Sequence, residues 1–159
     1  MTAKRAGRAK VPALRALALA LWLPLPLAAG TLDVTSPDGP VAQLPMPEAQ
    51  ETCLHWAHSV TGGAVADCFE NRAGQLVLTR SFLHDFAAGL GTHPDRGTLV
   101  SAPGGGYWIE GIDMALPGNR LVLRTGGATV GHSLRTPGNA ASVLPQRTRL
   151  VLTLTPCDG

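Results

Sequence analysis

The chain has 159 residues, of which 45% are hydrophobic and 15% are charged, and its formal net charge is +2. This length suits one domain, and the apolar content is enough for a hydrophobic core, so the composition excludes a disordered chain. Five of the thirteen Lys and Arg residues precede residue 16, whereas all eleven acidic residues follow residue 30, so the remainder is slightly acidic and shows no basic cluster for nucleic-acid binding.

Residues 1–30 have the pattern of a targeting segment. A basic stretch ends at Arg15, and an uncharged, mostly apolar run of 15 residues follows it at 16–30. This run contains two prolines and is shorter than the roughly 20 residues of a membrane-spanning helix. We expect a secretory signal peptide cleaved after Ala29 or Gly30, with an uncleaved N-terminal anchor as the alternative. The expected location is therefore periplasmic or secreted, with the anchored form held at the inner membrane.

Residues 31–50 hold four prolines among small polar residues, which predicts a semi-rigid, extended linker. A β domain is expected at 51–159. Short segments of alternating or β-branched character predict its strands, separated by breaks rich in glycine and proline. The expected strands are 52–60, 64–70, 75–82, 98–102, 107–113, 120–125, 128–134 and 149–155. This pattern predicts an all-β fold, a small antiparallel sandwich or barrel of about eight short strands.

The sequence TGGA at 61–64 predicts a tight hairpin between the first two expected strands. Gly62 and Gly63 can take the positive φ angles of a two-residue type I′ turn, so both are assigned a structural role. That turn sets His58 opposite Asp67 and Trp56 opposite Phe69, with Phe69 in the core. Because side chains alternate along a strand, Trp56 and His58 are expected on the apolar face.

Two interpretations of the His58–Asp67 pair stay open. It is either a buried, hydrogen-bonded pair that stabilises the hairpin, or the floor of a pocket in which Trp56, His58 and Asp67 contact a ligand. Trp108 is a further candidate, because it and Tyr107 point to opposite faces of their strand and one of the two is expected to be a surface or pocket aromatic.

No enzyme active site is expected. Ser59 points away from the adjacent His58, so the two cannot form an activated nucleophile and base. A possible group of metal ligands does not match the spacing of a metal motif and is interpreted as loop residues: His84, Asp85, His93, Asp95 and His132. No metal and no cofactor are therefore expected.

Three cysteines, Cys53, Cys68 and Cys157, allow one disulfide in an exported protein. The two-residue turn sets Cys68 opposite Ala57, so Cys53 is expected about 13 Å away along the strand. Disulfides need Cα atoms within about 7 Å of each other. A Cys53–Cys68 bridge is therefore not expected, and either cysteine is left to pair with Cys157.

The runs CLHWAHSVTGGAVADCF, GQLVLTRS, DFAAGLG, GGYWIEGID and PGNRLVLRTGG resemble the DUF1850 family of small exported or membrane-anchored bacterial proteins. The resemblance covers about residues 52–135, and its most specific element is Trp56-x-His58-Ser59-Val60. Members of this family occur beside the large membrane subunits of TAXI-type tripartite ATP-independent periplasmic (TRAP) transporters, which take up organic acids. The resemblance implies a transporter membrane subunit or solute receptor as the partner.

Together these observations predict a non-enzymatic periplasmic accessory domain of such a transporter, with no nucleic-acid partner. The alternative is a periplasmic domain that binds a small ligand or metal through the region of His58, Asp67 and Trp56. The first hypothesis predicts a protein partner and the second predicts stabilisation by a ligand, lost on replacing His58.

Overall fold

The computed structural model describes residues 30–85 and 97–156. The expected signal segment up to residue 29, His93, Asp95 and Cys157 lie outside these ranges. No helix in the described ranges is long and apolar enough to cross a membrane. The strands are β1 (Gly30–Ser36), β2 (Gly39–Pro45), β3 (Glu51–Ala57), β4 (Ala64–Arg72), β5 (Gln75–Leu83), β6 (Thr98–Ser101), β7 (Tyr107–Ala115), β8 (Arg120–Arg124), β9 (Ser133–Arg135), β10 (Ser142–Val143) and β11 (Arg149–Pro156), and the short 3-10 helix η2 (Pro117–Asn119) joins β7 to β8.

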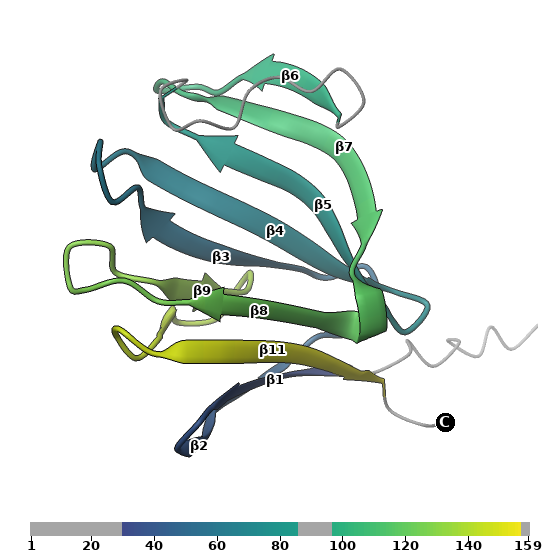
Figure 1. Ribbon diagram of the computed structural model, residues 1–159. Coiled ribbons are helices and arrows are strands. Elements are labelled where there is room, and N and C mark those ends of the chain that lie inside the picture. The colour runs from purple at the N-terminus through teal and green to yellow at the C-terminus, as the bar shows by residue number, and fades with distance from the viewer. Residues whose placement is uncertain (1–29, 86–96, 157–159) are drawn as a thin grey trace, which may run out of the picture.

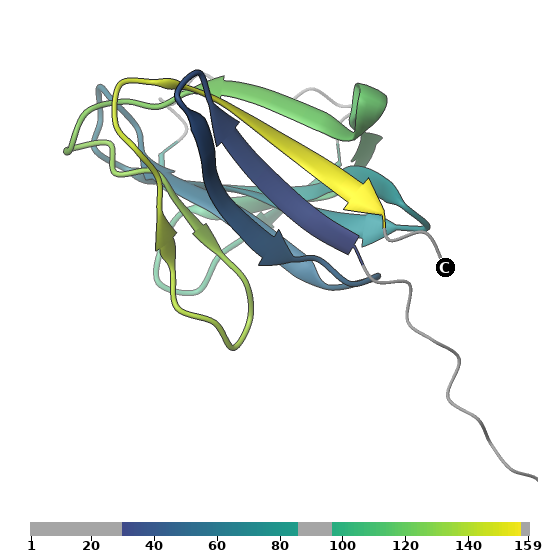
Figure 2. The ribbon, with the colours of Figure 1, turned by 90° about the horizontal axis from the view of Figure 1, so that it is seen from below.

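The strands form two antiparallel sheets that pack face to face. The smaller sheet has four strands in the order β2-β1-β11-β8, and the larger has seven in the order β10-β9-β3-β4-β5-β7-β6. The smaller sheet lies below the larger one in Figure 1, and it lies in front in the view from below in Figure 2. The predicted all-β antiparallel class is confirmed, and because neither sheet closes on itself the fold is a sandwich and not a barrel.

The prediction of a linker at 31–50 is wrong, because this segment supplies two strands of the smaller sheet. β1 pairs with β2 on one side and with the last strand, β11, on the other. Leu32 and Val34 point into the core with exposed fractions of 1% and 0%. The prolines misled the prediction: Pro40 and Pro45 lie in β2, at the edge of the sheet, where a strand has one side free of ladder hydrogen bonds and tolerates proline.

Most other expected strands are present with ends within three residues of the prediction. The exception is the expected strand 128–134, where residues 128–130 form a turn and β9 begins only at Ser133. The short strand β10 was not predicted. Both strands are short: β9 pairs with β3 over three residue pairs, and β10 pairs with β9 over two.

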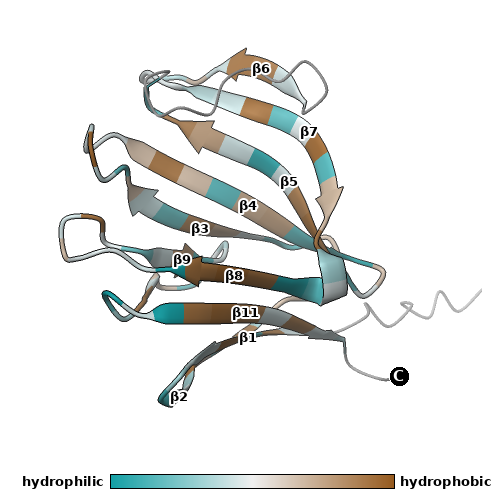
Figure 3. Ribbon diagram, viewed as in Figure 1, coloured by the Kyte–Doolittle hydropathy of each residue, from teal (hydrophilic) through white to brown (hydrophobic). Residues whose placement is uncertain are grey.

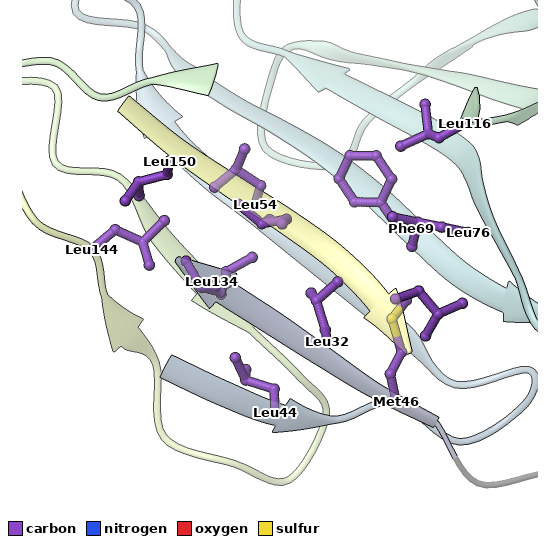
Figure 4. Packing of buried hydrophobic residues seen from close by; sticks show 13 residues of the cluster. Leu32, Leu44, Met46, Leu54, Phe69, Leu76, Leu116, Leu134, Leu144 and Leu150 are labelled. Carbon is purple, nitrogen blue, oxygen red and sulfur yellow. The ribbon is translucent and has the colours of Figure 1, made fainter. Parts of the chain in front are cut away.

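The hydrophobic core lies between the smaller sheet and the part of the larger sheet formed by β9, β3, β4 and the start of β5 (Figure 4). We call the face of the larger sheet that carries Leu54 and Phe69 the inner face, and the opposite one the outer face. Phe69 is 3% exposed, as its predicted structural role requires. The core consists of Leu32, Val34, Leu44, Met46, Leu54, Phe69, Leu76, Leu116, Leu134, Leu144, Leu150, Leu152 and Leu154. In Figure 3, hydrophilic residues interrupt β4, β5 and β7.

The β3–β4 hairpin has a different register from the predicted one. Leu54 is opposite Asp67, Trp56 is opposite Val65, and Thr52 is opposite Phe69. Each β3 residue therefore meets a residue four positions closer to the turn than predicted. A slip by an even number of residues keeps every side chain on its face, so Leu54 and Trp56 still face inward, but it changes every partner. The predicted contact between His58 and Asp67 is wrong.

A longer turn causes this change of register. The His58 N–H donates to the Gly63 carbonyl at 2.8 Å, so these two residues close a loop of residues 59–62, and the Gly62 N–H donates to the His58 carbonyl at 2.8 Å. Gly62 has a φ of +71°, as its structural role requires, whereas Gly63 does not have the positive φ that the two-residue turn predicted. A Cβ atom at Gly63 would lie 2.7 Å from an Asp85 carboxylate oxygen, so close packing explains this glycine.

The register places Cys53 directly opposite Cys68, with their Cα atoms 4.0 Å apart, and a disulfide joins them. The expectation that these cysteines cannot bridge is therefore wrong. Its error follows from the assumed two-residue turn, because the four-residue loop moves Cys68 from a position opposite Ala57 to one opposite Cys53. This disulfide lies on the outer face, since Cys53 alternates with the inward Leu54.

Candidate functional site

The strand registers arrange the outer face of the larger sheet into two rows of side chains that cross the strands. Directly opposed residues of neighbouring strands share a face, so each row can be followed from pair to pair. The first row runs Arg135, Cys53, Cys68, Arg80 and Glu110, and the second runs Ser133, His55, Ala66, Phe82, Trp108 and Val100. The first row is charged around a central disulfide, and the second is largely aromatic and apolar.

An open pocket of about 330 Å³ lies along the second row. Its residues are His55, Ala64, Val65, Ala66, Phe82, Ala102, Pro103 and Trp108. Ala64 and Ala66 leave space because their methyl groups fill little volume between the larger side chains on β3 and β5. Phe82 and Trp108 form the aromatic wall, with ring centroids 5.2 Å apart and planes tilted by 56°. Ala102 and Pro103 reach the pocket from the connection between β6 and β7.

An arginine fixes one side of this wall. The Arg80 Nε donates to a Glu51 carboxylate oxygen at 2.8 Å, and a second guanidinium nitrogen donates to the other oxygen. The same guanidinium lies 4.2 Å from the centre of the Trp108 ring. Its hydrogen bonds to Glu51 raise the pKa of Arg80 above its usual value. A planar cation held by two hydrogen bonds restricts the orientation of the aromatic ring against which it stacks.

His55 is the imidazole of the pocket. It is half-buried, and burial lowers its pKa below 6.5, helped by the nearby charge of Arg135 and opposed by Glu51. The imidazole is therefore neutral at pH 7 and offers one hydrogen-bond donor and one acceptor. Ser133 is its directly opposed neighbour on β9, but no hydrogen bond joins the two side chains among the described residues. The arrangement provides hydrogen bonding to a bound group and lacks the hydrogen-bonded contact of an activated serine.

One group of potential metal ligands occurs in the described residues. Glu51, Cys53 and Cys68 have ligand atoms within 4.8 Å of one another. The two sulfur atoms are bonded to each other, and Glu51 binds Arg80. None of these three is available to a metal while the disulfide is intact. His84, Asp85 and His132 belong to no such group in this part of the chain.

The predicted site residues lie apart. Trp56 is on the inner face and stacks on His132, with ring centroids 5.9 Å apart and planes at 8°. His58 lies in the hairpin turn, where its Nδ1 accepts the Thr61 N–H at 3.3 Å. Burial raises the pKa of Asp67, whose carboxylate accepts the Ser81 hydroxyl at 2.6 Å. Of the four residues proposed to bind a ligand or partner, Trp108 is the one that lines the pocket.

Sequence reasoning missed His55, Ala66, Phe82 and the Arg80–Glu51 pair. A signal for them was present: pairing Cys53 with Cys68 fixes the β3–β4 register and places Ala66 beside His55. The bulge at Thr79, which separates the pairs Phe69–Leu78 and Cys68–Arg80, has no comparable signal in the sequence.

Comparison with protein-family models gives a match over more than half of the chain. A family model described as "Domain of unknown function (DUF1850)" matches residues 53–142, more than half of the chain. Both rows of the outer face fall within these residues. No curated protein and no solved structure matches the chain. The match over this length confirms the resemblance seen in the sequence, and the chain belongs to the DUF1850 family.

Proposed function

We propose that this protein is a non-enzymatic, exported binding domain, and that the outer face of its larger sheet is the binding surface. The single observation that carries the proposal is the pocket of about 330 Å³ in the second row. Pockets with mostly apolar and aromatic walls and a few polar groups are the usual form of binding sites. The position also fits, because the outer face of a sheet in a sandwich is accessible to a partner.

The walls of this pocket are held in place before anything binds. The Cys53–Cys68 disulfide connects β3 to β4 next to the pocket floor, and the Arg80–Glu51 ion pair restrains Trp108. Less side-chain freedom is then lost on binding, which favours affinity. Rigid, mostly apolar pocket walls with few chemically reactive groups support recognition more than catalysis.

The partner in this proposal is a membrane subunit or solute receptor of a TAXI-type TRAP transporter. Two arguments support it: the family's occurrence beside such transporters, and an N-terminal sequence typical of export. In this proposal the domain works in the periplasm, either released by cleavage or held at the inner membrane by an uncleaved segment. The accessory role requires direct contact with the transporter.

Co-purification tests the proposal. The tagged chain is produced together with the subunits of a TAXI-type TRAP transporter of the same organism, and the recovered subunits are quantified. We expect Ala64→Leu, which adds volume at an exposed position of the pocket, to reduce recovery at least about tenfold, since a few central contacts supply most interface energy. Ala115→Leu is the matched control, because Ala115 is exposed and is not among the residues lining the pocket. Equal recovery with both variants, or unchanged solute uptake after deletion of the gene, would contradict the proposal.

Binding of a small ligand or metal through His58, Asp67 and Trp56 is a weaker candidate. The register separates His58 from Asp67, and Trp56 packs on His132 at the inner face. These residues therefore form no common cavity in the described structure. A small ligand has a better site in the outer pocket.

A further inference from the structure

The two ends of the outer pocket differ in polarity. At the β5–β7 end, Phe82 and Trp108 present aromatic surface, and Pro103 adds an apolar rim. At the β3–β9 end, His55 lines the pocket and Arg135 lies on the same face, one pair further along. Diagonal neighbours of this kind have Cα atoms about 7–8 Å apart, within reach of an arginine side chain. A ligand in the pocket thus meets apolar groups at one end and nitrogen donors at the other.

Of the charged residues that the structure describes near the pocket, one cation forms no ion pair. Arg80 is neutralised by Glu51, and Glu110 lies opposite Arg80 on β7. Arg135 is exposed, and no carboxylate of residues 30–85 or 97–156 forms an ion pair with it. Its charge is near enough to His55 to lower the pKa of that imidazole. The donor end of the pocket therefore favours an anionic group.

The size of the pocket limits the rest of the ligand. A volume of about 330 Å³ is at the lower end of the range for small-molecule sites, so one ring or one branched chain fits. The exposed Ala64 gives a small apolar contact at the floor, and the tilted Phe82 and Trp108 rings give contact at the side. Both favour an apolar body over a polar one such as a sugar.

We propose that this pocket binds a small carboxylic acid with an aromatic or branched apolar body. The body contacts Ala64, Phe82 and Trp108, and the carboxylate accepts hydrogen bonds from Arg135 and from the imidazole N–H of His55. The inference rests on the binding role proposed above for the outer face. It does not depend on the transporter as partner, because the ligand binds the isolated chain.

Titration of the purified full-length chain with phenylacetate tests the inference, with tryptophan fluorescence and thermal melting as readouts. Of the three tryptophans, Trp108 lines the pocket and reports occupancy. We expect saturable binding with a Kd on the order of 1 mM, usual for so small a ligand, and a rise in Tm with concentration. Phenylacetamide, its neutral counterpart, should bind at least about tenfold more weakly, and acetate should not bind measurably.

Variants locate the site. Arg135→Gln should reduce phenylacetate affinity to that of phenylacetamide, and Arg135→Lys should retain part of it. Ala64→Leu, at an exposed position of the pocket, should abolish binding. Arg124→Gln is the matched control, since Arg124 is an exposed arginine on β8 of the other sheet. Melting curves without ligand verify that each variant is folded.

Several results would overturn the inference: no saturation by phenylacetate or by the branched acid isovalerate, equal affinity for phenylacetate and phenylacetamide, or unchanged binding by Ala64→Leu. Failure of acid binding while the transporter subunits still co-purify removes this inference alone. Acid binding without co-purification removes the transporter partner and leaves the ligand site.

Discussion

Removal of the Cys53–Cys68 disulfide should destabilise the domain by about 3 kcal/mol. The bridge closes a loop with a sequence separation of 15. In the chain-entropy model, a loop of that length lowers the entropy of the unfolded chain by about 10 cal/mol/K, which is about 3 kcal/mol at 25 °C. This is a large fraction of the 5–15 kcal/mol that is typical of whole domains.

The assay is urea unfolding of the Cys53→Ala/Cys68→Ala variant, followed by tryptophan fluorescence. With an m-value of about 1.5–2 kcal/mol/M, the midpoint should fall by about 1.5–2 M, and Tm by about 10 °C. Reduction of the unchanged chain separates loop entropy from packing, because reduction keeps both sulfur atoms in place. Cys157→Ser is the control and should leave the midpoint unchanged, since Cys157 is the cysteine outside the bridge.

Two results would refute this reasoning. One is peptide mapping that finds Cys53 or Cys68 bound to Cys157, which would restore the two-residue turn. The other is a double variant as stable as the unchanged chain, which would show that the β3–β4 ladder needs no covalent support. A single free thiol per oxidised chain, titrated after unfolding, is the expected complementary result.

Three further predictions concern two partly buried titratable groups, Asp67 and His55, and the backbone at Gly106. Burial raises the pKa of Asp67, so the folded state holds this proton more tightly than the unfolded state, and stability falls as pH rises from 3.8 through the folded pKa. The Asp67→Asn side chain can still accept the Ser81 hydroxyl, so this variant should flatten the fall in urea titrations and stabilise the domain at pH 7. Burial lowers the pKa of His55, so the unfolded state holds its proton more tightly, and stability should fall as pH drops from 6.5 through the folded pKa. The His55→Gln variant should lose that pH dependence, and a pH profile of the variant equal to that of the unchanged chain would contradict the neutral imidazole. Gly106→Ala should lower the free energy of unfolding by about 1–3 kcal/mol, because φ is +77° and the added Cβ would lie 2.7 Å from the Leu83 carbonyl oxygen. A Tm equal to that of the unchanged chain would exclude this strain.

The candidate site could be predicted only in part. Trp108 was identified because alternation along its strand leaves one of two adjacent aromatics outside the core. His55 was not, because Trp56 and His58 drew attention to the inner face, while His55 points to the outer one. The second row brings His55, Ala66 and Phe82 together from three strands, and no local pattern in any one strand indicates which residues of the next strand lie opposite.

The transporter partner and the export of the chain remain predictions. The family match covers residues 53–142 and adds no activity, since its description is a domain of unknown function. The experiments above separate the partner from the ligand because each is measured without the other.

The sequence alone determined the all-β class, the antiparallel hairpins and the face of most side chains. These features depend on alternation over a few residues and on turn-forming glycines, so they are local. Only the tertiary structure decided the register of β3 against β4, the pairing of β1 with β11, and the bulge in β5. A hairpin with two residues in its turn and one with four satisfy the same local pattern, and the choice between them comes from the disulfide and from packing around Gly63. Partner strands far apart in sequence meet only when their apolar faces are buried together, which no short stretch of sequence specifies.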